Sequence, residues 1–355
     1  MPMSTVRIMS SRKKVAIGMS GGVDSSVAAS VLLESGYDVI GINMLLWQNK
    51  NAVSNDAKTV CDRLGIELHT LDFCDEFSKS VIDYFTDEYI KGRTPNPCIV
   101  CNKLLKFDAM AKAAKALGAD CIATGHYAKI EKCEETGRYI LKRATADKKD
   151  QTYALYSLNQ EQLSHLLLPL GDFENKDKVR EYAKEHRLVT ADKPDSQEIC
   201  FIPDNDYSGF IKRRTGNVPK EGNFVDKDGN ILGIHKGIIN YTIGQRKGLG
   251  IAFGKPMFVT HIDAEKNEVV LGEQGTEFSD TLYADRVNFI PFDKLSGPMR
   301  VKAKVRYAAN PADCTVSDEG ERIKVVFDEP QRAITPGQAV VFYNGDIVVG
   351  GGTIL

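Results

Sequence analysis

The 355-residue sequence has no apolar run near the roughly 20 residues that a membrane-spanning helix needs, so we expect no membrane association. It also lacks the dense cysteine framework of a small secreted protein, because its eight cysteines are scattered through a long chain. Scattered thiols favour a reducing compartment and predict a cytoplasmic location. Neither sign of charge predominates: the net charge is −2, so nucleic-acid binding cannot be argued from the charge of the whole chain.

What is present is an ordinary globular composition, with 42% hydrophobic and 26% charged residues. The length exceeds what one hydrophobic core usually serves and predicts two or three domains. Residues 1–13 precede the first apolar run, are basic and contain no acidic side chain. We interpret them as a disordered extension, since the segment is too short and too weakly amphipathic for a transit peptide.

Residues 14–203 alternate short apolar runs with helical patterns, which predicts βαβ units and a doubly wound parallel sheet. Predicted strands are Val15 to Met19, Tyr37 to Leu45, Ile66 to Leu71 and Ala119 to Ala123. Predicted helices are Ser25 to Ser35, Asp56 to Leu64, Phe77 to Lys91 and Phe107 to Leu117. In such a sheet ligands bind at the carboxyl ends of the strands, so the loops after these strands are where we expect chemistry.

Two smaller regions follow. Residues 204–274 are glycine-rich and locally basic: between Asn205 and Thr260 nine Lys or Arg stand against four Asp or Glu, a balance of +5. This stretch suits contacts with phosphate, although on charge alone a solvated face explains it as well. Residues 275–355 alternate strongly, as in Arg300 to Tyr307, Arg322 to Phe327 and Ala339 to Tyr343, and predict a small antiparallel β-barrel.

The sharpest motif is Ser20-Gly21-Gly22-Val23-Asp24-Ser25-Ser26, between the first predicted strand and helix. Glycines allow a tight turn that presents N–H groups to an anion, and a helix N-terminus adds a favourable dipole. The serine hydroxyls can donate to phosphate oxygens, and Asp24 can hold the accompanying Mg²⁺. No Gly-Lys-Ser/Thr follows, so the loop differs from the P-loop of enzymes that cleave at the γ-phosphate.

In this position the motif resembles the PP-loop of the ATP pyrophosphatases, which adenylate an oxygen of their substrate. Further segments resemble the tRNA-specific 2-thiouridylases in the family's order over nearly the whole chain. These segments are Gly92 to Phe107, Ala123 to Tyr127, Lys149 to Tyr153, Ser196 to Ile202, Thr242 to Gly250, Thr335 to Gln338 and Gly350 to Gly352. The chain departs from the family after Trp47, where only Gln48 to Ser54 remain of a commonly longer loop.

The resemblance implies ATP-dependent 2-thiolation of the wobble uridine (position 34) in tRNAs for Lys, Glu and Gln. AMP transfer would turn the C2 oxygen into a good leaving group, and a Cys200 persulfide assisted by Cys101 would deliver sulfur. Both cysteines map onto loops, with Cys101 just ahead of a helical run from Asn102, and thiolates near a helix start have lowered pKa values. Asp24 completes the catalytic set, and a cysteine desulfurase or relay protein would supply the sulfur.

The remaining roles are carried over by motif. The residues implied for ATP binding are Gly18, Met19, Ser20, Gly21, Gly22, Val23, Asp24, Ser25, Met44 and Gly125. Those implied to contact the target base are Asn96, Pro97 and Cys98. Those implied to bind tRNA are His126, Lys149, Asp150, Gln151, Arg306, Tyr307 and Gln338, with residues 204–274 and the barrel gripping the anticodon arm. A packing role for Met44 is nearly as good an interpretation.

Cys98 is a second departure, since many family members have Asp there. Three readings stay open. Cys98, Cys101 and Cys200 can ligate a 4Fe–4S cluster with one open iron; Cys98 and Cys101 can form a redox-active pair; or Cys98 is a tolerated substitution. As the sulfur donor, a cysteine persulfide and an iron–sulfur cluster fit the sequence about equally well. A different class of function, a tRNA-binding paralogue without sulfur transfer, is disfavoured by the intact loop and cysteine pair.

Overall fold

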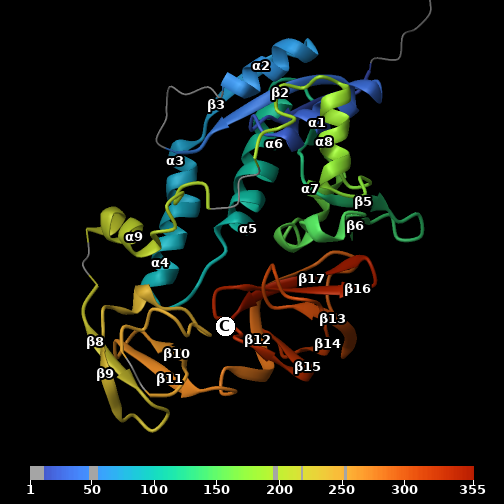
Figure 1. Cartoon of the computed structure of the whole chain (residues 1–355). Helices are drawn as coiled ribbons and strands as arrows, with labels where there is room; N and C mark the ends of the chain where they lie inside the picture. The colour runs from blue at the N-terminus through green and yellow to red at the C-terminus, as the bar shows by residue number, and fades with distance from the viewer. Residues whose placement is uncertain (1–11, 48–54, 195–198, 217–218, 252–253) are drawn as a thin grey trace, which may run out of the picture.

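A computed structural model describes residues 12–47, 55–194, 199–216, 219–251 and 254–355. Three sequence-based predictions lie wholly or partly outside these ranges: most of the extension 1–13, the shortened loop Gln48 to Ser54, and the Ser196 to Glu198 part of the Cys200 motif. Figure 1 shows three parts, with the N-terminal sheet and its helices above, a small sheet below left, and a barrel below right.

The N-terminal sheet is fully parallel, with the strand order β3-β2-β1-β4-β7, which confirms the predicted doubly wound domain. Its strands are β1 (Lys14–Gly18), β2 (Asp38–Leu45), β3 (Leu68–Asp72), β4 (Cys121–Ala123) and β7 (Leu166–Leu167). Alternate residues enter two different cores: Val15 and Ile17 pack on one side, Ala16 and Ile42 on the other. A sheet buried on both faces accounts for the continuous apolar runs in the sequence.

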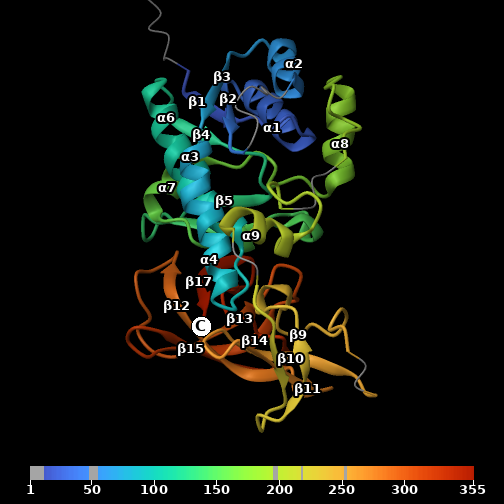
Figure 2. The same ribbon diagram turned by 90° about the vertical axis from the view of Figure 1, so that its left-hand side faces the viewer.

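Helices cover both faces of this sheet. They are α1 (Val23–Glu34), α2 (Asn55–Leu64), α3 (Cys74–Phe77), η1 (Ser78–Ile82), α4 (Asp83–Ile90), α5 (Pro97–Cys101), η2 (Asn102–Ala109), α6 (Met110–Ala116), α7 (Gln160–Ser164) and α8 (Lys176–Glu185), with short 3₁₀ turns η3 (Asp147–Lys149) and η4 (Thr152–Ala154). The segments α3, η1 and α4 follow one another without a break and run from the sheet down to the small sheet (Figures 1 and 2). Likewise α5, η2 and α6 form one helix, of which η2 is a π-helix.

The helix formed by α5, η2 and α6 begins earlier than the sequence predicted. The prediction began it at Phe107, whereas the structure begins it at Pro97. Asn96 caps it, because its Oδ1 accepts a hydrogen bond from the Cys98 N–H at 3.2 Å, and Pro97 occupies the first helical position. Cys101 therefore lies inside a helix, not on a loop as predicted.

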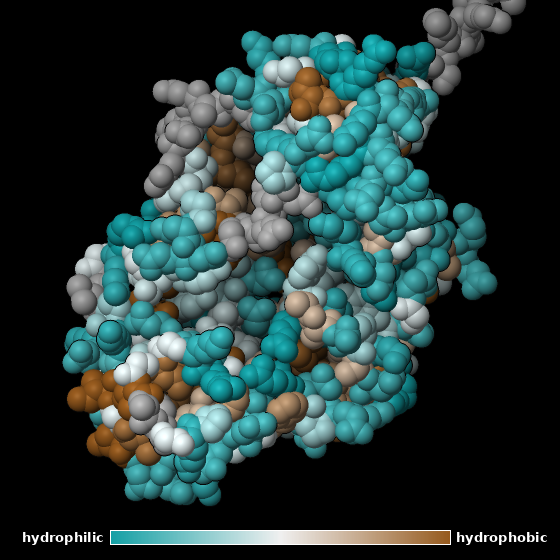
Figure 3. All heavy atoms as spheres, in the orientation of Figure 1, coloured by the Kyte–Doolittle hydropathy of each residue, from teal (hydrophilic) through white to brown (hydrophobic). Residues whose placement is uncertain are grey.

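The central region forms a four-stranded sheet with the order β10-β11-β8-β9, which the sequence pattern had not indicated. Its elements are α9 (Tyr207–Thr215), β8 (Gly222–Val225), β9 (Ile231–His235), η5 (Ile238–Asn240), β10 (Met257–Asp263) and β11 (Glu268–Glu273). Its apolar residues share one core with α3, α4 and Phe201. On the outer side, over β9, the exposed Ile231 and Ile234 contribute to a hydrophobic area (Figure 3).

The C-terminal region confirms the predicted antiparallel barrel. Its strands are β12 (Phe278–Phe289), β13 (Met299–Lys304), β14 (Ala312–Asp318), β15 (Ile323–Arg332), β16 (Ala339–Asn344) and β17 (Ile347–Ile354). Pairing of β12 with both β15 and β17 closes the barrel. The hairpin β5 (Ala128–Lys132) and β6 (Tyr139–Arg143) from the N-terminal region extends the same sheet through β17. Within the described ranges, no helix is both long and apolar enough to cross a membrane.

Candidate active site

The glycine loop after β1 lies at the point where the strand order reverses, since the chain continues from β1 to β2 on one side and reaches β4 on the other. Ligands of doubly wound sheets bind at this switch point. Gly21 adopts φ 73°, a left-handed conformation that glycine accepts without strain. Gly22 is the N-cap of α1 and has no side chain with which to cap the helix, so the first turn offers its N–H groups to an anion.

The serines of the loop are held in place by the loop itself. The Ser25 and Ser26 hydroxyls donate to the Gly22 carbonyl oxygen at 3.1 and 2.8 Å, and Ser20 Oγ lies 3.3 Å from Ser25 Oγ. Ser20 is exposed, whereas Ser25 and Ser26 are buried. The loop is therefore a preformed turn with an exposed hydroxyl at its edge.

Gly125, at the end of β4, touches the backbone of this loop. A Cβ added there would lie 2.8 Å from the Asp24 carbonyl carbon and 2.9 Å from the Ser25 nitrogen. Only glycine permits the segment after β4 to approach the first turn of α1 this closely. The structure thus brings Gly125 and the loop together, and the role in ATP binding that the resemblance implies for Gly125 stays a prediction.

Asp24 makes contacts that sequence reasoning missed. Lys176 Nζ donates to both of its carboxylate oxygens, at 2.8 and 2.7 Å, and the Tyr127 hydroxyl donates to Oδ1 at 2.5 Å. Lys193 Nζ donates to the Gly21 carbonyl at 2.9 Å and to Asp56 at 2.5 Å. Lys176 lies 152 residues from Asp24, so nothing local in the sequence links them. Two lysines, Lys176 and Lys193, therefore lie at the loop, where their positive charges are suited to bind anionic phosphates.

The other residues implied for ATP binding lie on or beside this edge. Gly18 ends β1, Val23 begins α1, and Met19 is buried with its N–H donating to the Ile42 carbonyl at 2.7 Å. Met44, near the end of β2, is half-buried and packs against two apolar cores. Its packing role is therefore supported, and contact with a nucleotide stays a prediction.

Three cysteines stand at the second part of the site. Cys98 and Cys101 lie in the first turns of the helix that Asn96 caps; Cys98 is exposed and Cys101 is 6% exposed. Cys200 is exposed in a turn just before the buried Phe201. Cys101 and Phe201, the residue after Cys200, belong to one apolar core, against which Val100 and Ile199 also pack. This packing brings the segment of Cys200 to the helix that carries Cys98 and Cys101, in agreement with the influence of both thiols on the pKa of Cys200.

The predicted lowering of the thiol pKa values is wrong for the free thiols. Desolvation by the surrounding protein raises the pKa of Cys98 and of Cys101, and it raises the pKa of Cys200, with contributions from the other two thiols, to about 11. Among the described residues, Lys106, half-buried on η2, lowers the pKa of all three thiols and so opposes the rise. Lys106 is thus a functional candidate that motif reading missed.

His126 follows Gly125 and lies between the loop and η2. Burial, and secondarily the charge of Lys106, lowers its pKa well below the ordinary value, so the ring is neutral at neutral pH. Its Nδ1 lies 2.8 Å from Thr124 Oγ1, and its ring packs against Phe107 at 5.6 Å. These contacts fix the orientation of a neutral imidazole against η2, the helical segment that follows Cys101.

The cysteines do not offer a ready metal site. Among the described residues, no three His, Cys, Asp or Glu side chains are gathered so that they could hold a metal ion. The cluster reading of Cys98, Cys101 and Cys200 therefore gains no support from this arrangement, and we derive no step through a cluster.

Comparison with known proteins agrees with this geometry. Three family profiles match in order: the tRNA methyl transferase HUP domain over residues 13–204, the tRNA methyl transferase PRC-barrel domain over 208–273, and the aminomethyltransferase beta-barrel domain over 279–354. A tRNA-specific 2-thiouridylase MnmA of Clostridioides difficile is 58% identical over 96% of this chain and 98% of its own length. The chain belongs to the tRNA-specific 2-thiouridylase family. Proteins of the same name from Acetivibrio thermocellus and Clostridium acetobutylicum are each 56% identical over 97% and 96% of the chain and 99% of their own length.

The central sheet and the barrel both hold the loop that leads to Asn96 and Pro97, two residues that the resemblance implies to contact the target base. A Cβ added to Gly92 would lie 2.7 Å from Ile262 Cγ2 on β10. On the barrel side, the Thr94 N–H donates to the Pro336 carbonyl at 2.8 Å and Gln338 Nε2 donates to the Thr94 carbonyl at 2.8 Å. The loop leading to Asn96 and Pro97 is therefore clamped between the central sheet and the barrel.

The residues implied for tRNA binding are placed unevenly. Arg306 and Tyr307 are exposed, and the Tyr307 hydroxyl donates to the Asp150 carbonyl at 3.3 Å. Asp150 itself is buried: its carboxylate accepts from the Ala144 N–H and the Thr152 hydroxyl, and desolvation raises its pKa. Gln151 Oε1 accepts from the Tyr127 N–H at 2.9 Å.

These contacts give Asp150, Gln151 and Gln338 structural roles of their own. The half-buried Lys149 and the exposed Arg306 and Tyr307 are better placed to meet a ligand from outside. A direct contact of any of them with tRNA stays a prediction.

Proposed function

We propose that this protein replaces the C2 oxygen of the wobble uridine (position 34) in tRNAs for Lys, Glu and Gln by sulfur, using ATP. The observation that carries the proposal is the presence of a PP-loop at the switch point and of the thiols Cys101 and Cys200 in one chain whose full-length relatives are named tRNA-specific 2-thiouridylases. The loop alone would support only adenylation, and the two thiols alone would support only sulfur transfer.

In the first half-reaction, the C2 oxygen attacks the α-phosphorus of ATP, the bond to pyrophosphate breaks, and an O-adenylated uridine forms. The loop N–H groups, Ser20, Lys176 and Lys193 are suited to hold phosphate oxygens. Asp24 is a carboxylate beside them, and one carboxylate plus substrate phosphates is a usual environment for Mg²⁺. Bound Mg²⁺ would neutralise charge on the departing pyrophosphate, and Lys176 would then exchange its contact with Asp24 for one with phosphate.

In the second half-reaction, the terminal sulfur of a Cys200 persulfide attacks C2, the C–O bond breaks, and AMP leaves with its oxygen. The Cys101 thiolate then attacks Cys200 Sγ, which releases 2-thiouridine and leaves a Cys101–Cys200 disulfide. An external thiol reductant must restore both thiols before the next turnover. Lys106 supports this sequence because it is the cation that favours the thiolate form of both cysteines.

Sulfur must reach Cys200 from outside, and its exposure is compatible with delivery by a cysteine desulfurase or a persulfide relay protein. The exposed Cys98 fits a redox-active pair with Cys101 within one helix turn. The family descriptions that mention methyl transfer suggest another reaction, but the combination of two neighbouring thiols and a nucleotide loop in one chain favours sulfur transfer. A reducing cytoplasm suits a mechanism that consumes free thiols.

The test is a reconstituted reaction of the full chain with unmodified tRNA, ATP, Mg²⁺ and a persulfide donor. We expect pyrophosphate release and 2-thiouridine to depend on both ATP and tRNA. Binding of tRNA without either product would favour the non-catalytic paralogue instead.

A further inference from the structure

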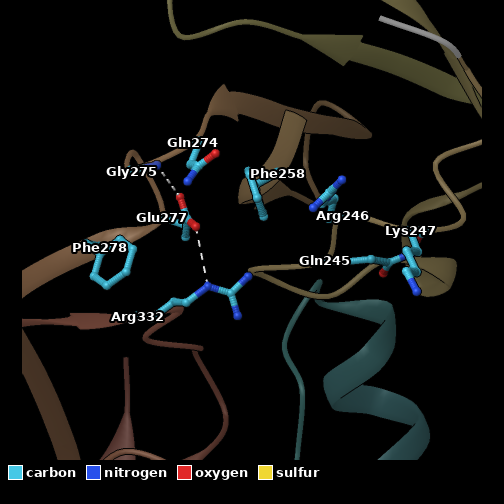
Figure 4. Close-up of a pocket in the computed structure, with 9 residues that line it drawn as sticks. All are labelled: Gln245, Arg246, Lys247, Phe258, Gln274, Gly275, Glu277, Phe278 and Arg332. Carbon is cyan, nitrogen blue, oxygen red and sulfur yellow. Dashed lines mark hydrogen bonds and ion pairs between the residues drawn. The ribbon is translucent and has the colours of Figure 1, made fainter. Parts of the chain in front are cut away.

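An open cavity of about 690 Å³ lies between the central sheet and the barrel, away from the glycine loop and the cysteines. Its volume falls in the range of roughly 300–1,000 Å³ that small-ligand sites occupy. The lining residues come from the loop before β10, from β10 itself, from the β11–β12 connection, from the start of β12 and from the end of β15. They are Gln245, Arg246, Lys247, Phe258, Gln274, Gly275, Glu277, Phe278 and Arg332 (Figure 4).

One wall of the cavity is a built arginine site. Arg332 Nε lies 3.3 Å from Glu277 Oε1, its Nη2 donates to the Gly244 carbonyl at 3.3 Å, and its guanidinium stands 5.6 Å over the Phe258 ring. The Glu277 side chain is only 3% exposed, and its Oε2 accepts the Gly275 N–H at 2.8 Å. A guanidinium held from three sides is preorganised for a planar or anionic partner.

The charge of the lining is positive. Arg246, Lys247 and Arg332 stand against the single carboxylate of Glu277 among the described lining residues. Arg246 and Lys247 are exposed on a loop that Gln245 fixes, since its Oε1 accepts the Thr242 N–H and its Nε2 donates to the Lys247 carbonyl, both at 3.0 Å. An anionic ligand is therefore favoured over a neutral or cationic one.

An aromatic ring distinguishes this cavity from a simple phosphate site. Phe278 is 47% exposed, and Figure 4 places it at one end of the cavity, with Lys247 at the other and Arg332 reaching into the space between them. Exposing a phenylalanine to water is unfavourable, and an open ring beside cations is the arrangement on which single-stranded nucleic acids stack a base. A bare phosphate would make no use of the ring.

The cavity is also connected to the loop that leads to Asn96. Phe258 and Ile262 lie on the same strand, β10, and Ile262 packs against Gly92. On the other side, Arg332 ends β15 just before the turn in which Pro336 accepts from the Thr94 N–H. A nucleotide bound in the cavity would thus lie between the two supports of the loop that leads to Asn96.

We infer that this cavity binds an unpaired nucleotide of the RNA substrate other than the target uridine, stacking its base at Phe278 and holding its phosphate at Arg246 and Lys247. This inference rests on the proposed function, because it assigns the cavity to the same tRNA. The site positions the RNA strand relative to the clamped loop, so its contribution is to substrate affinity and register.

The test measures tRNA affinity of the full chain without ATP or sulfur donor, over a series of salt concentrations. Phe278→Ala should weaken binding by about 5-fold or more at every salt concentration, the loss expected for one base–aromatic stack, and Phe278→Tyr should restore it. Arg246→Ala should reduce the slope of log affinity against log salt by about 0.7–0.9, as one lost phosphate contact does.

Two matched variants control for generic effects. Val189→Ala removes an exposed apolar side chain, and Lys115→Ala an exposed cation, both from the N-terminal domain and outside the cavity lining. Both should bind tRNA as the wild type does. Unchanged affinity in Phe278→Ala, or a loss that Phe278→Tyr does not restore, would overturn the inference.

The result of this binding test does not depend on whether the protein thiolates tRNA. If the wild type forms no 2-thiouridine but Phe278→Ala still weakens tRNA binding, the proposed reaction fails while the cavity assignment stands. If the wild type thiolates and the cavity variants bind normally, the assignment alone fails.

Discussion

The closest backbone approach in the site gives its most quantitative prediction. In Gly125→Ala the new Cβ would lie 2.8 Å from the Asp24 carbonyl carbon and 2.9 Å from the Ser25 nitrogen, whereas ordinary contact begins at 3.4 Å. The glycine loop must therefore retreat by about 0.6 Å, the difference between 3.4 and 2.8 Å, because backbone atoms cannot rotate away. Overpacking of this kind costs about 1–3 kcal/mol.

For a domain of this size that cost lowers Tm by about 2–12 °C, at roughly 2–4 °C per kcal/mol, so the variant should still fold. Catalysis should suffer more, since a misplacement of about 1 Å costs on the order of 100-fold in rate. We therefore expect tRNA-dependent pyrophosphate release to fall by roughly 10- to 100-fold.

The assay is pyrophosphate release at saturating ATP and tRNA, with Tm measured in parallel. Gly297→Ala is the matched control, because a Cβ there meets no described heavy atom within 4 Å. A Gly125→Ala protein that releases pyrophosphate at the wild-type rate would refute the assignment of this strand edge to the nucleotide.

Three further predictions concern the same site. Asp24→Asn should abolish pyrophosphate release while the protein stays folded by circular dichroism; retained release would remove Asp24 from the adenylating machinery. Lys106→Gln should slow 2-thiouridine formation by roughly 3- to 10-fold, because a cation favouring the thiolates is lost, whereas the exposed Lys103→Gln on the same helix should not; equal rates in both would exclude the electrostatic role. Alkylation of Cys200, followed by mass spectrometry of its peptide, should accelerate up to about pH 11, since its thiol is protonated below that pKa; a plateau near pH 8.5, the ordinary thiol pKa, would contradict the desolvated environment.

Local patterns predicted the framework of the N-terminal domain well. The strands β1 and β2 and the helices α1 and α2 lie within a residue or two of their predicted bounds, because buried apolar runs and glycine turns are local signals. The barrel was predicted for the same reason, from period-two alternation. Its extension by β5 and β6 was not, since strand partners so far apart in sequence leave no local mark.

Motifs in the sequence indicated the residues of the candidate site but not the residues that support them. Asn96 and Pro97 formed a readable helix start that would have placed Cys101 inside a helix. Lys176 and Lys106, in contrast, are lysines on helices. Their roles depend on which residues the fold places next to them, and the sequence alone does not show this. The raised thiol pKa values have the same origin, because desolvation depends on tertiary packing.

The most direct measurement is nucleoside mass spectrometry of tRNA after reaction with ATP, Mg²⁺ and a persulfide donor, for the wild type, Cys101→Ser, Cys200→Ser and Cys133→Ser. Cys133 is a thiol outside the site and serves as the control. The account predicts 2-thiouridine at the wobble position with the wild type and Cys133→Ser, and none with Cys101→Ser or Cys200→Ser, although all four proteins bind tRNA. Formation of 2-thiouridine by either of those two variants would contradict the sulfur-transfer roles on which the account rests.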